Sequence, residues 1–199
     1  ERVMALPGSA GDVNLLVNNA GVLDFGNILD VPLAAVTRDF ETNFYGTLNT
    51  IRPALEHMRR AGRGHVLICS SCLSKISMPF FAAYSATKAA QDHFGRAMRH
   101  ELRPLHIHVS TVHPIGTRTE FSSQVTVRTG VPGREATLPD SWKQSAEYVA
   151  SCIVRCLQRP RGEVWPSAMA RYIAAFATAF PGLADAALHR KFGQRILQR

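Results

Sequence analysis

Tyr84 and Lys88 stand four residues apart in the alanine-rich stretch "AAYSATKAAQDHF". On a helix this spacing places both side chains on one face, one turn apart. A phenol has an ordinary pKa of about 10, and a nearby ammonium group lowers that pKa because it favours the phenolate. The pair therefore indicates a proton-transfer site. The alternative is an ordinary helix that carries a half-buried tyrosine and a surface lysine.

Two further polar residues stand where a site could form. Ser71 comes directly after a predicted buried strand, and Asn43 interrupts a long helical pattern. Asn19 belongs to "NNAG", which closes an earlier strand. In an open parallel sheet, ligands bind beyond the carboxyl ends of the strands. We therefore expect Ser71, Asn19 and the segment after Val112 to emerge at this edge.

Apolar runs and helical periodicity alternate along the first half of the chain. Buried strands are predicted over 13–17, 64–70 and 106–112, and long helices over 33–60 and 81–103. Strands separated by long helices predict a parallel sheet with crossover helices, which is an α/β fold.

The second half of the chain is less regular. A helix is predicted over 145–158, a short fourth strand in "GEVWPS", and one or two tail helices with a break at Pro181-Gly182. Gly, Pro, Thr and Ser are mixed after residue 116, as is typical of a loop. We expect one domain over 1–199, with a lid at about 116–145 and a C-terminal helical extension at about 168–199.

The composition is that of a globular protein, because 46% of the 199 residues are hydrophobic and 19% are charged. The formal net charge of +8 is compatible with a phosphate-bearing cofactor, a nucleic acid or an acidic membrane surface. The basic residues do not alternate with aromatic residues, so we expect no nucleic-acid partner. The sequence shows no signal-peptide pattern, and the cytoplasm is the expected compartment.

Metal binding is a weaker interpretation of the cysteines and histidines. Zinc sites use C-x-x-C and similar spacings, but these cysteines fall on apolar segments, where packing is the better explanation. The four are Cys69, Cys72, Cys152 and Cys156. His106 and His108 share a strand face without an evident third ligand, and His113 is expected to be structural. We therefore predict no metal site.

The tail contains the apolar stretch "AMARYIAAFATAF", followed by several basic residues. It is too short to span a bilayer. It could lie on a membrane surface, or it could pack on its own domain or on a partner subunit. These alternatives stay open from the sequence.

Taken in order, these motifs resemble those of the short-chain dehydrogenase/reductase family, with its usual Asn–Ser–Tyr–Lys active site. The resemblance runs from about Gly11 to Thr119 and more weakly to about Ser167. It rests on Asn18–Gly21, Asn43, Ser70–Ser71, Tyr84–Lys88 and Pro114–Thr119. It implies a Rossmann-like, doubly wound parallel sheet and an NAD- or NADP-dependent oxidoreductase that acts on an alcohol or ketone.

The resemblance also implies a role for each active-site residue. Tyr84 would be the general acid/base, and Lys88 would modulate it and bind the nicotinamide ribose. Ser71 would hydrogen-bond the substrate oxygen, and Asn43 would hold a water molecule that links the lysine to solvent. By the same likeness, the residues around the cofactor would be Asn19, Ala20, Gly21, Tyr84, Lys88, Pro114, Thr117 and Thr119. Ile115 stands where the family usually has glycine.

The sequence departs from the family pattern at both ends. The family opens with a strand and a glycine-rich, phosphate-binding turn, which are absent from the printed sequence. We expect this adenine-binding part to precede the residues given, because otherwise a normally central strand becomes an unpaired edge. The choice between NAD and NADP depends on that part. The C-terminal third also differs, which suggests its own assembly surface or a membrane contact.

The resemblance to the family also leads to expectations about oligomeric state and substrate class. The helices over 33–60 and 81–103 correspond to the family's common dimer interface, so we expect at least a homodimer. The residues expected to line the substrate pocket are apolar, which favours a lipophilic alcohol or ketone. They are Cys72, Met78, Phe80, Ile115 and Phe121.

Two other functions stay open from the sequence. The chain could be a non-catalytic binding or scaffold protein of the same fold that cannot hold a dinucleotide. A serine hydrolase built on Ser71 and Lys88 is disfavoured, because no G-x-S-x-G motif surrounds the serine.

Overall fold

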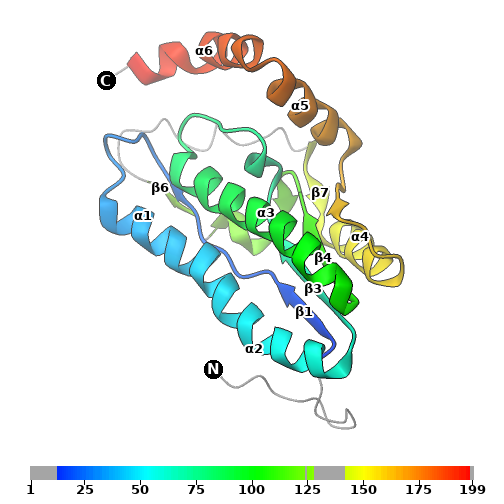
Figure 1. Cartoon of the computed structure of the whole chain (residues 1–199). Coiled ribbons are helices and arrows are strands. Elements are labelled where there is room, and N and C mark those ends of the chain that lie inside the picture. Colours follow the sequence, from blue (N-terminus) through cyan, green and yellow to red (C-terminus); the bar gives the residue numbers. More distant parts are fainter. Residues whose placement is uncertain (1–12, 124, 128–141, 198–199) are drawn as a thin grey trace.

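A four-stranded parallel sheet forms the centre of the molecule (Figure 1). The computed structural model describes residues 13–123, 125–127 and 142–197. The strand order is β1-β3-β4-β8, and every neighbouring pair is parallel. The strands are β1 (Leu15–Asn18), β3 (Gly64–Cys69), β4 (Ile107–Val112) and β8 (Glu163–Val164). The α/β fold with a parallel sheet is thus confirmed.

The long helix predicted over 33–60 contains a wider turn in its middle. Helix α1 (Leu33–Phe40) passes into a π-helical turn (Glu41–Tyr45) and then into α2 (Gly46–Ala61). Helix α2 ends at Gly62, whose φ of 65° is a conformation that glycine adopts without strain. The π-helical turn contains the buried Asn43, at the position where the sequence indicated an interruption.

Helices cover both faces of the sheet, which makes the fold doubly wound. Helices α2 and α3 (Ala82–Leu102) pack on one face, and α4 (Ala146–Gln158) packs on the other. Strand β3 alternates accordingly: Val66 belongs to the core under α2, and Leu67 to the core under α4. The predicted packing role of Cys152 and Cys156 is confirmed, because both are buried in the core under α4.

Helix α3 lies very close to the sheet at Gly95. A Cβ atom added there would lie 2.8 Å from Cγ2 of Thr111 on β4. Only glycine allows this approach without a shift of the sheet or the helix. The close packing fixes the height of α3 above the carboxyl ends of the strands.

Two short parallel pairs lie outside the central sheet, and tight turns join some of the elements. Strand β2 (Asp24–Phe25) pairs with β6 (Thr126–Val127), and β5 (Thr117–Arg118) pairs with β7 (Gln144–Ser145). The 3-10 turns cover Cys72–Ser74, Arg103–Leu105 and Glu120–Ser123. The part of the predicted lid over 128–141 lies outside the described residues.

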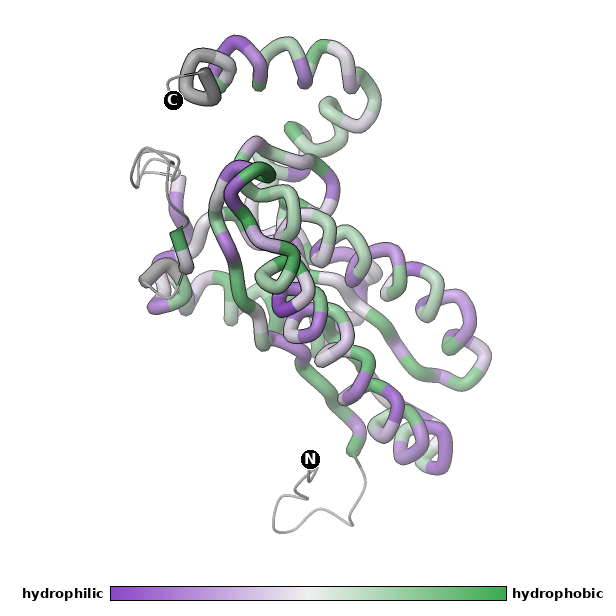
Figure 2. The backbone as a smooth tube through the Cα atoms, turned by 90° about the vertical axis from the view of Figure 1, so that its left-hand side faces the viewer, coloured by the Kyte–Doolittle hydropathy of each residue, from purple (hydrophilic) through white to green (hydrophobic). Residues whose placement is uncertain are grey.

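The tail forms two helices, α5 (Ala168–Ala179) and α6 (Pro181–Leu197). Their junction confirms the predicted break before Gly182. Figures 1 and 2 both show α5 and α6 at one end of the molecule, far from the C-terminal end of α2. Helix α6 lies over the start of α3, where the Phe192 ring is 6.5 Å from that of Phe80.

Candidate active site

Ser71 and Tyr84 meet beyond the carboxyl end of β3. Ser71 follows this strand by two residues, and its Oγ accepts a hydrogen bond from the backbone N–H of Leu73 at 3.1 Å. Tyr84 lies in the first turn of α3, and its hydroxyl is close enough to that of Ser71 for the two groups to interact. The structure therefore brings together two hydroxyl groups that the sequence separates by a loop.

Lys88 lies one helical turn after Tyr84, as the spacing predicts. Its side chain is buried, and Nζ lies 5.6 Å from the centre of the Tyr84 ring. Nζ donates hydrogen bonds to the carbonyl oxygen of Cys69 and to Oε1 of Gln91, each at 2.9 Å. Ser70 Oγ in turn donates to the carbonyl oxygen of Lys88 at 2.9 Å, which ties α3 to the end of β3.

Asn43 uses its whole side chain to join two other segments. Its Oδ1 accepts from the N–H of Val22 at 2.8 Å, and its Nδ2 donates to the carbonyl oxygen of Val22 at 3.0 Å. Nδ2 also donates to Oγ1 of Thr87 at 2.9 Å. Asn43 therefore holds the chain that follows "NNAG" against α3, in the turn before Lys88.

Gln91 connects Lys88 to Asn43, and sequence reasoning missed it. Its Nε2 donates to the carbonyl oxygen of Asn43 at 2.6 Å and to Oγ1 of Thr47 at 2.8 Å. The orientation of this amide is fixed by chemistry, because an ammonium group only donates and a carbonyl oxygen only accepts. The amide of Gln91 thus links the ammonium group of Lys88 to the backbone of Asn43.

The segment predicted to form the cofactor floor follows β1. Asn19 and Ala20 are exposed, and Gly21 is half-buried. A Cβ atom added to Gly21 would lie 3.4 Å from Asn43 Oδ1 and 3.6 Å from Lys88 Nζ. The backbone at Gly21 therefore passes directly over two of the predicted active-site residues.

The predicted turn after β4 lies next to the Ser71 segment. The backbone N–H of Cys72 donates to the carbonyl oxygen of Pro114 at 2.9 Å. Oγ1 of Thr117 donates to the carbonyl oxygen of Ile115 at 2.9 Å, so the turn closes with isoleucine in place of glycine. Thr119 Oγ1 accepts a hydrogen bond from the backbone N–H of Phe121. The rings of Tyr84 and Phe121 lie 6.3 Å apart.

Burial shifts the pKa values of the two central groups in opposite directions. It lowers the pKa of Lys88 to about 8, against the opposing effect of Cys69. Burial also raises the pKa of Tyr84, although the interaction with the Ser71 hydroxyl acts in the other direction. The expected lowering of the tyrosine pKa is thus not found, because the desolvation of the phenolate outweighs this opposing effect.

Comparison with known proteins identifies the family. The sequence model of the family described as short chain dehydrogenase matches residues 3–129. The chain belongs to this family. The described fold agrees with that of a short-chain dehydrogenase from Burkholderia cenocepacia J2315 in complex with NADP, at a TM-score of 0.75 and 28% identity. That alignment covers 90% of this chain and 72% of the other.

Curated relatives are similar to this chain over most of its length. Dehydrogenase/reductase SDR family member 7B of Xenopus laevis is 33% identical over 155 residues, which are 78% of this chain and 48% of that protein. Retinol dehydrogenase 8 of Bos taurus is 32% identical over 131 residues, which are 66% of this chain and 42% of that protein. The chain spans about half the length of these relatives.

The predicted pocket residues of this chain fall into three groups. Phe80 and Met78 line a cavity of about 590 Å³ under α6, together with Leu188 and Phe192. Ile115 is only 8% exposed and packs in the protein interior. Cys72 and Phe121 flank Ser71 and Tyr84, through the contacts described above. The predicted apolar residues are therefore divided among a cavity, the core and the surroundings of Ser71 and Tyr84.

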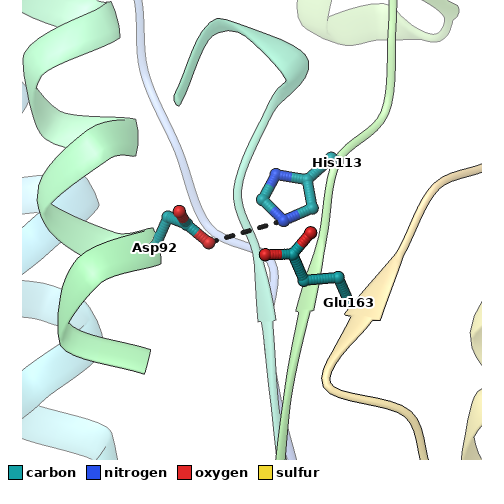
Figure 3. Close-up of side chains that lie close together, drawn as sticks. All are labelled: Asp92, His113 and Glu163. Atoms are coloured by element: carbon teal, nitrogen blue, oxygen red, sulfur yellow. Dashed lines mark ion pairs between the residues drawn. The ribbon is translucent and has the colours of Figure 1, made fainter. Parts of the chain in front are cut away.

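Behind Ser71 lies a cluster that the sequence did not reveal. Asp92 of α3, His113 after β4 and Glu163 of β8 point toward one another (Figure 3). Among the described residues, this group, and not the cysteine or histidine pairs of the sequence, has the donor atoms and spacing of a possible metal site. No local sequence signal identified the cluster, because Asp92, His113 and Glu163 stand far apart in the sequence.

Proposed function

We propose that this chain is an NAD- or NADP-dependent oxidoreductase that transfers hydride between the nicotinamide and an alcohol or ketone. The observation that carries the proposal is the convergence of Ser71, Tyr84 and Lys88 at the carboxyl end of β3. A phenol, a hydroxyl and an ammonium group in one place supply what the oxygen of a reacting carbonyl needs.

The proposed roles follow from the charge that develops on the substrate oxygen. The cofactor, when bound, supplies or accepts the hydride at the carbonyl carbon. In reduction, Tyr84 gives its proton to the oxygen, and in oxidation it takes that proton back. Ser71 donates a hydrogen bond to the same oxygen and stabilises its negative charge. Lys88 favours the phenolate form of Tyr84 through its positive charge.

The nicotinamide half of a dinucleotide fits the described residues. Gly21 leaves open the space above Asn43 and Lys88 that a side chain would fill. Asn19 and Ala20 present exposed backbone beside it. The solved relative from Burkholderia cenocepacia is in complex with NADP, which supports this class of cofactor. Lys88, Tyr84, Pro114 and the two threonines of the following turn are proposed to complete the contacts.

We propose a lipophilic alcohol or ketone as the substrate class. The cavity under α6 is lined mostly by apolar side chains, among them Met78, Phe80 and Phe192. It begins directly before the first turn of α3, which carries Tyr84. The name of one relative, retinol dehydrogenase 8, is that of an enzyme for a lipophilic alcohol.

Substitution of Tyr84 tests the proposal. Tyr84→Phe removes the proton donor and should lower kcat about 100- to 10,000-fold, while the cofactor Kd stays nearly unchanged. Turnover is followed by the absorbance of the reduced cofactor, and binding by its fluorescence. Retained turnover in Tyr84→Phe contradicts the assigned chemistry. A folded full-length protein that binds neither NADH nor NADPH supports the scaffold alternative instead.

For assembly, we propose a second copy of the chain as partner of the groove between α2 and α3. This groove of about 370 Å³ is apolar along its floor, with Arg52 on one helix and Glu101 on the other. A two-fold axis would pair each charge with the opposite charge of the second copy. Arg52→Glu should weaken the dimer in light scattering, and the double variant with Glu101→Arg should restore it. A monomer with the native sequence contradicts this assembly.

Contact with a membrane surface stays a prediction, as does the cytoplasmic location. Tyr172 and Phe176 of α5 are 74% and 51% exposed. None of the described helices combines the length and apolar character that crossing a bilayer requires. Co-sedimentation with neutral and anionic phospholipid vesicles tests the surface contact, and Phe176→Glu should abolish it.

A further inference from the structure

His113 is fully buried, and both of its ring nitrogens have polar partners. Nδ1 lies 3.0 Å from Ser74 Oγ and 3.2 Å from the carbonyl oxygen of Ser71. Nε2 lies 3.1 Å from Thr111 Oγ1 and 3.4 Å from Asp92 Oδ1. The ring therefore connects the backbone of Ser71 on one side to a carboxylate on the other.

A tryptophan fixes the plane of this ring. The rings of His113 and Trp165 are stacked, with centres 4.5 Å apart and an angle of 16° between the planes. Trp165 Nε1 donates to Oε2 of Glu163 at 2.9 Å, so the tryptophan is itself held. A ring with a fixed plane and two fixed edges can hold its neighbours in one geometry.

A lysine partly balances the charges of the two carboxylates behind the ring. Lys75 Nζ lies 2.7 Å from Asp92 Oδ2 and 3.1 Å from Glu163 Oε1. Asp92, Glu163 and His113 could ligate a metal ion by their spacing. The ammonium group of Lys75 already lies between the two carboxylates and contacts both, and it would repel a divalent ion bound beside it. The cluster is therefore better explained as a support than as a metal site.

We propose that His113 is a positioning residue for the reaction: together with Ser74, it holds the carbonyl oxygen of Ser71 and so places the Ser71 hydroxyl against Tyr84. Asp92 contacts His113 in turn (Figure 3), and Lys75 pairs with both Asp92 and Glu163. This inference rests on the proposed function, in which Ser71 contacts the substrate oxygen.

Ser71 needs such a support because its own segment is short. Ser74 Oγ donates to the carbonyl oxygen of Ser71 at 2.7 Å, and Ser71 has an extended backbone with φ −160° and ψ 160°. The peptide group after Ser71 therefore sets the direction of its side chain. A displacement of about 1 Å in a reacting group lowers a rate on the order of 100-fold. Loss of the His113 contact should thus appear in kcat.

Two variants of His113 distinguish the contacts of its Nδ1 atom from those of its Nε2 atom. The amide nitrogen of His113→Asn reaches the position of Nδ1 and can still donate to Ser71, whereas the longer amide of His113→Gln reaches the position of Nε2. We expect kcat to fall on the order of 10- to 100-fold in His113→Gln and less than about 10-fold in His113→Asn. The cofactor Kd should change in neither. His93→Gln, on the exposed side of α3, is the matched control and should behave as the native protein.

The His113→Gln substitution in a Ser71→Ala background tests whether His113 acts through the Ser71 hydroxyl. If His113 acts through the hydroxyl of Ser71, His113→Gln should lower kcat little further once that hydroxyl is absent. A role in stability alone would lower the melting temperature equally in both backgrounds and would not favour Asn over Gln. Equal losses of kcat in the two His113 variants, or a full additional loss in the Ser71→Ala background, overturn the proposal.

Amide hydrogen exchange gives a readout that needs no turnover. The N–H of Leu73 donates to Ser71 Oγ, so its exchange reports the place of the Ser71 side chain. His113→Gln should speed this exchange at least about 10-fold, while His113→Asn should leave it near the native rate. Unchanged exchange in both variants refutes the positioning role. Absent turnover in the native protein refutes only the proposed function.

Discussion

The two supports of the candidate site, one behind Lys88 and one behind Ser71, differ in charge. Lys88 is held by neutral groups, the amide of Gln91 and a backbone carbonyl oxygen. The proposed support of Ser71 is His113. His113 contacts Asp92, and Asp92 and Glu163 are both paired with Lys75.

The difference has a physical reason. A carboxylate next to Lys88 would raise the pKa of that lysine, whereas neutral acceptors leave it low. The hydroxyl of Ser71 carries no charge of its own. Its support can therefore contain ions, provided that carboxylates and an ammonium group contact one another. The difference predicts that the two supports respond differently to substitution.

Removal of the cation should cause the largest effect. Lys75→Met leaves the fully buried Asp92 and the half-buried Glu163 without their shared positive charge. We expect a loss of about 3 kcal/mol in the free energy of unfolding, because the carboxylates stay desolvated. Denaturation in urea measures it, with Lys75→Arg as the control that keeps the charge. A loss below about 1 kcal/mol would show that this support does not depend on ion pairing.

Among the neutral groups around Lys88, substitution of Asn43 should cause the largest loss of stability. Asn43→Ala removes its hydrogen bonds to the backbone of Val22 and to Thr87. These buried partners then have no replacement, so we expect a loss of about 2 kcal/mol in the free energy of unfolding. Asn43→Asp keeps the shape but loses the donor, and it should fall between the alanine variant and the native protein. A native-like stability of Asn43→Ala contradicts its role as a clamp.

The pH dependence of turnover tests the neutral support of Lys88. The pKa of this lysine is about 8, so its positive charge is present below that pH and is lost as the pH rises through it. Activity should therefore decline above pH about 8. Gln91→Glu places a negative charge beside Nζ and should move the decline upward by about 1 pH unit. Gln91→Met removes the acceptor and should move it downward, and a decline at the same pH in all three proteins contradicts the assignment.

The smallest effects compare one threonine from each support. Thr87→Val removes a hydroxyl that contacts neutral partners, Asn43 and the carbonyl oxygen of Tyr84. Thr111→Val removes a hydroxyl that contacts Asp92 and His113. Hydrogen bonds to charged groups are worth more, so we expect losses of about 1 and about 2 kcal/mol respectively. Equal losses in thermal unfolding would remove the distinction between the supports.

Helix α3 shows how far the sequence could lead. Its limits were predicted within one residue, and the spacing of Tyr84 and Lys88 was interpreted correctly, because helical geometry is local. The neighbouring residues Gln91 and Asp92 were not recognised. They stand next to each other in the sequence, yet Gln91 belongs to the support of Lys88 and Asp92 to that of Ser71. Their partners lie on other elements, so no local pattern assigns them.

The sequence by itself determined the strands of the central sheet, the main helices and the order of the motifs, since periodicity, turn residues and stop signals act over a few residues. It also determined that Ser71 would stand at the carboxyl end of a strand. Only the tertiary structure decided which polar residues hold the site. Gln91 meets Asn43 across 48 residues, and Lys75 meets Glu163 across 88. Such contacts exist only after β3, β4 and β8 have aligned and α3 has packed on them, because the order of strands brings distant residues to one edge.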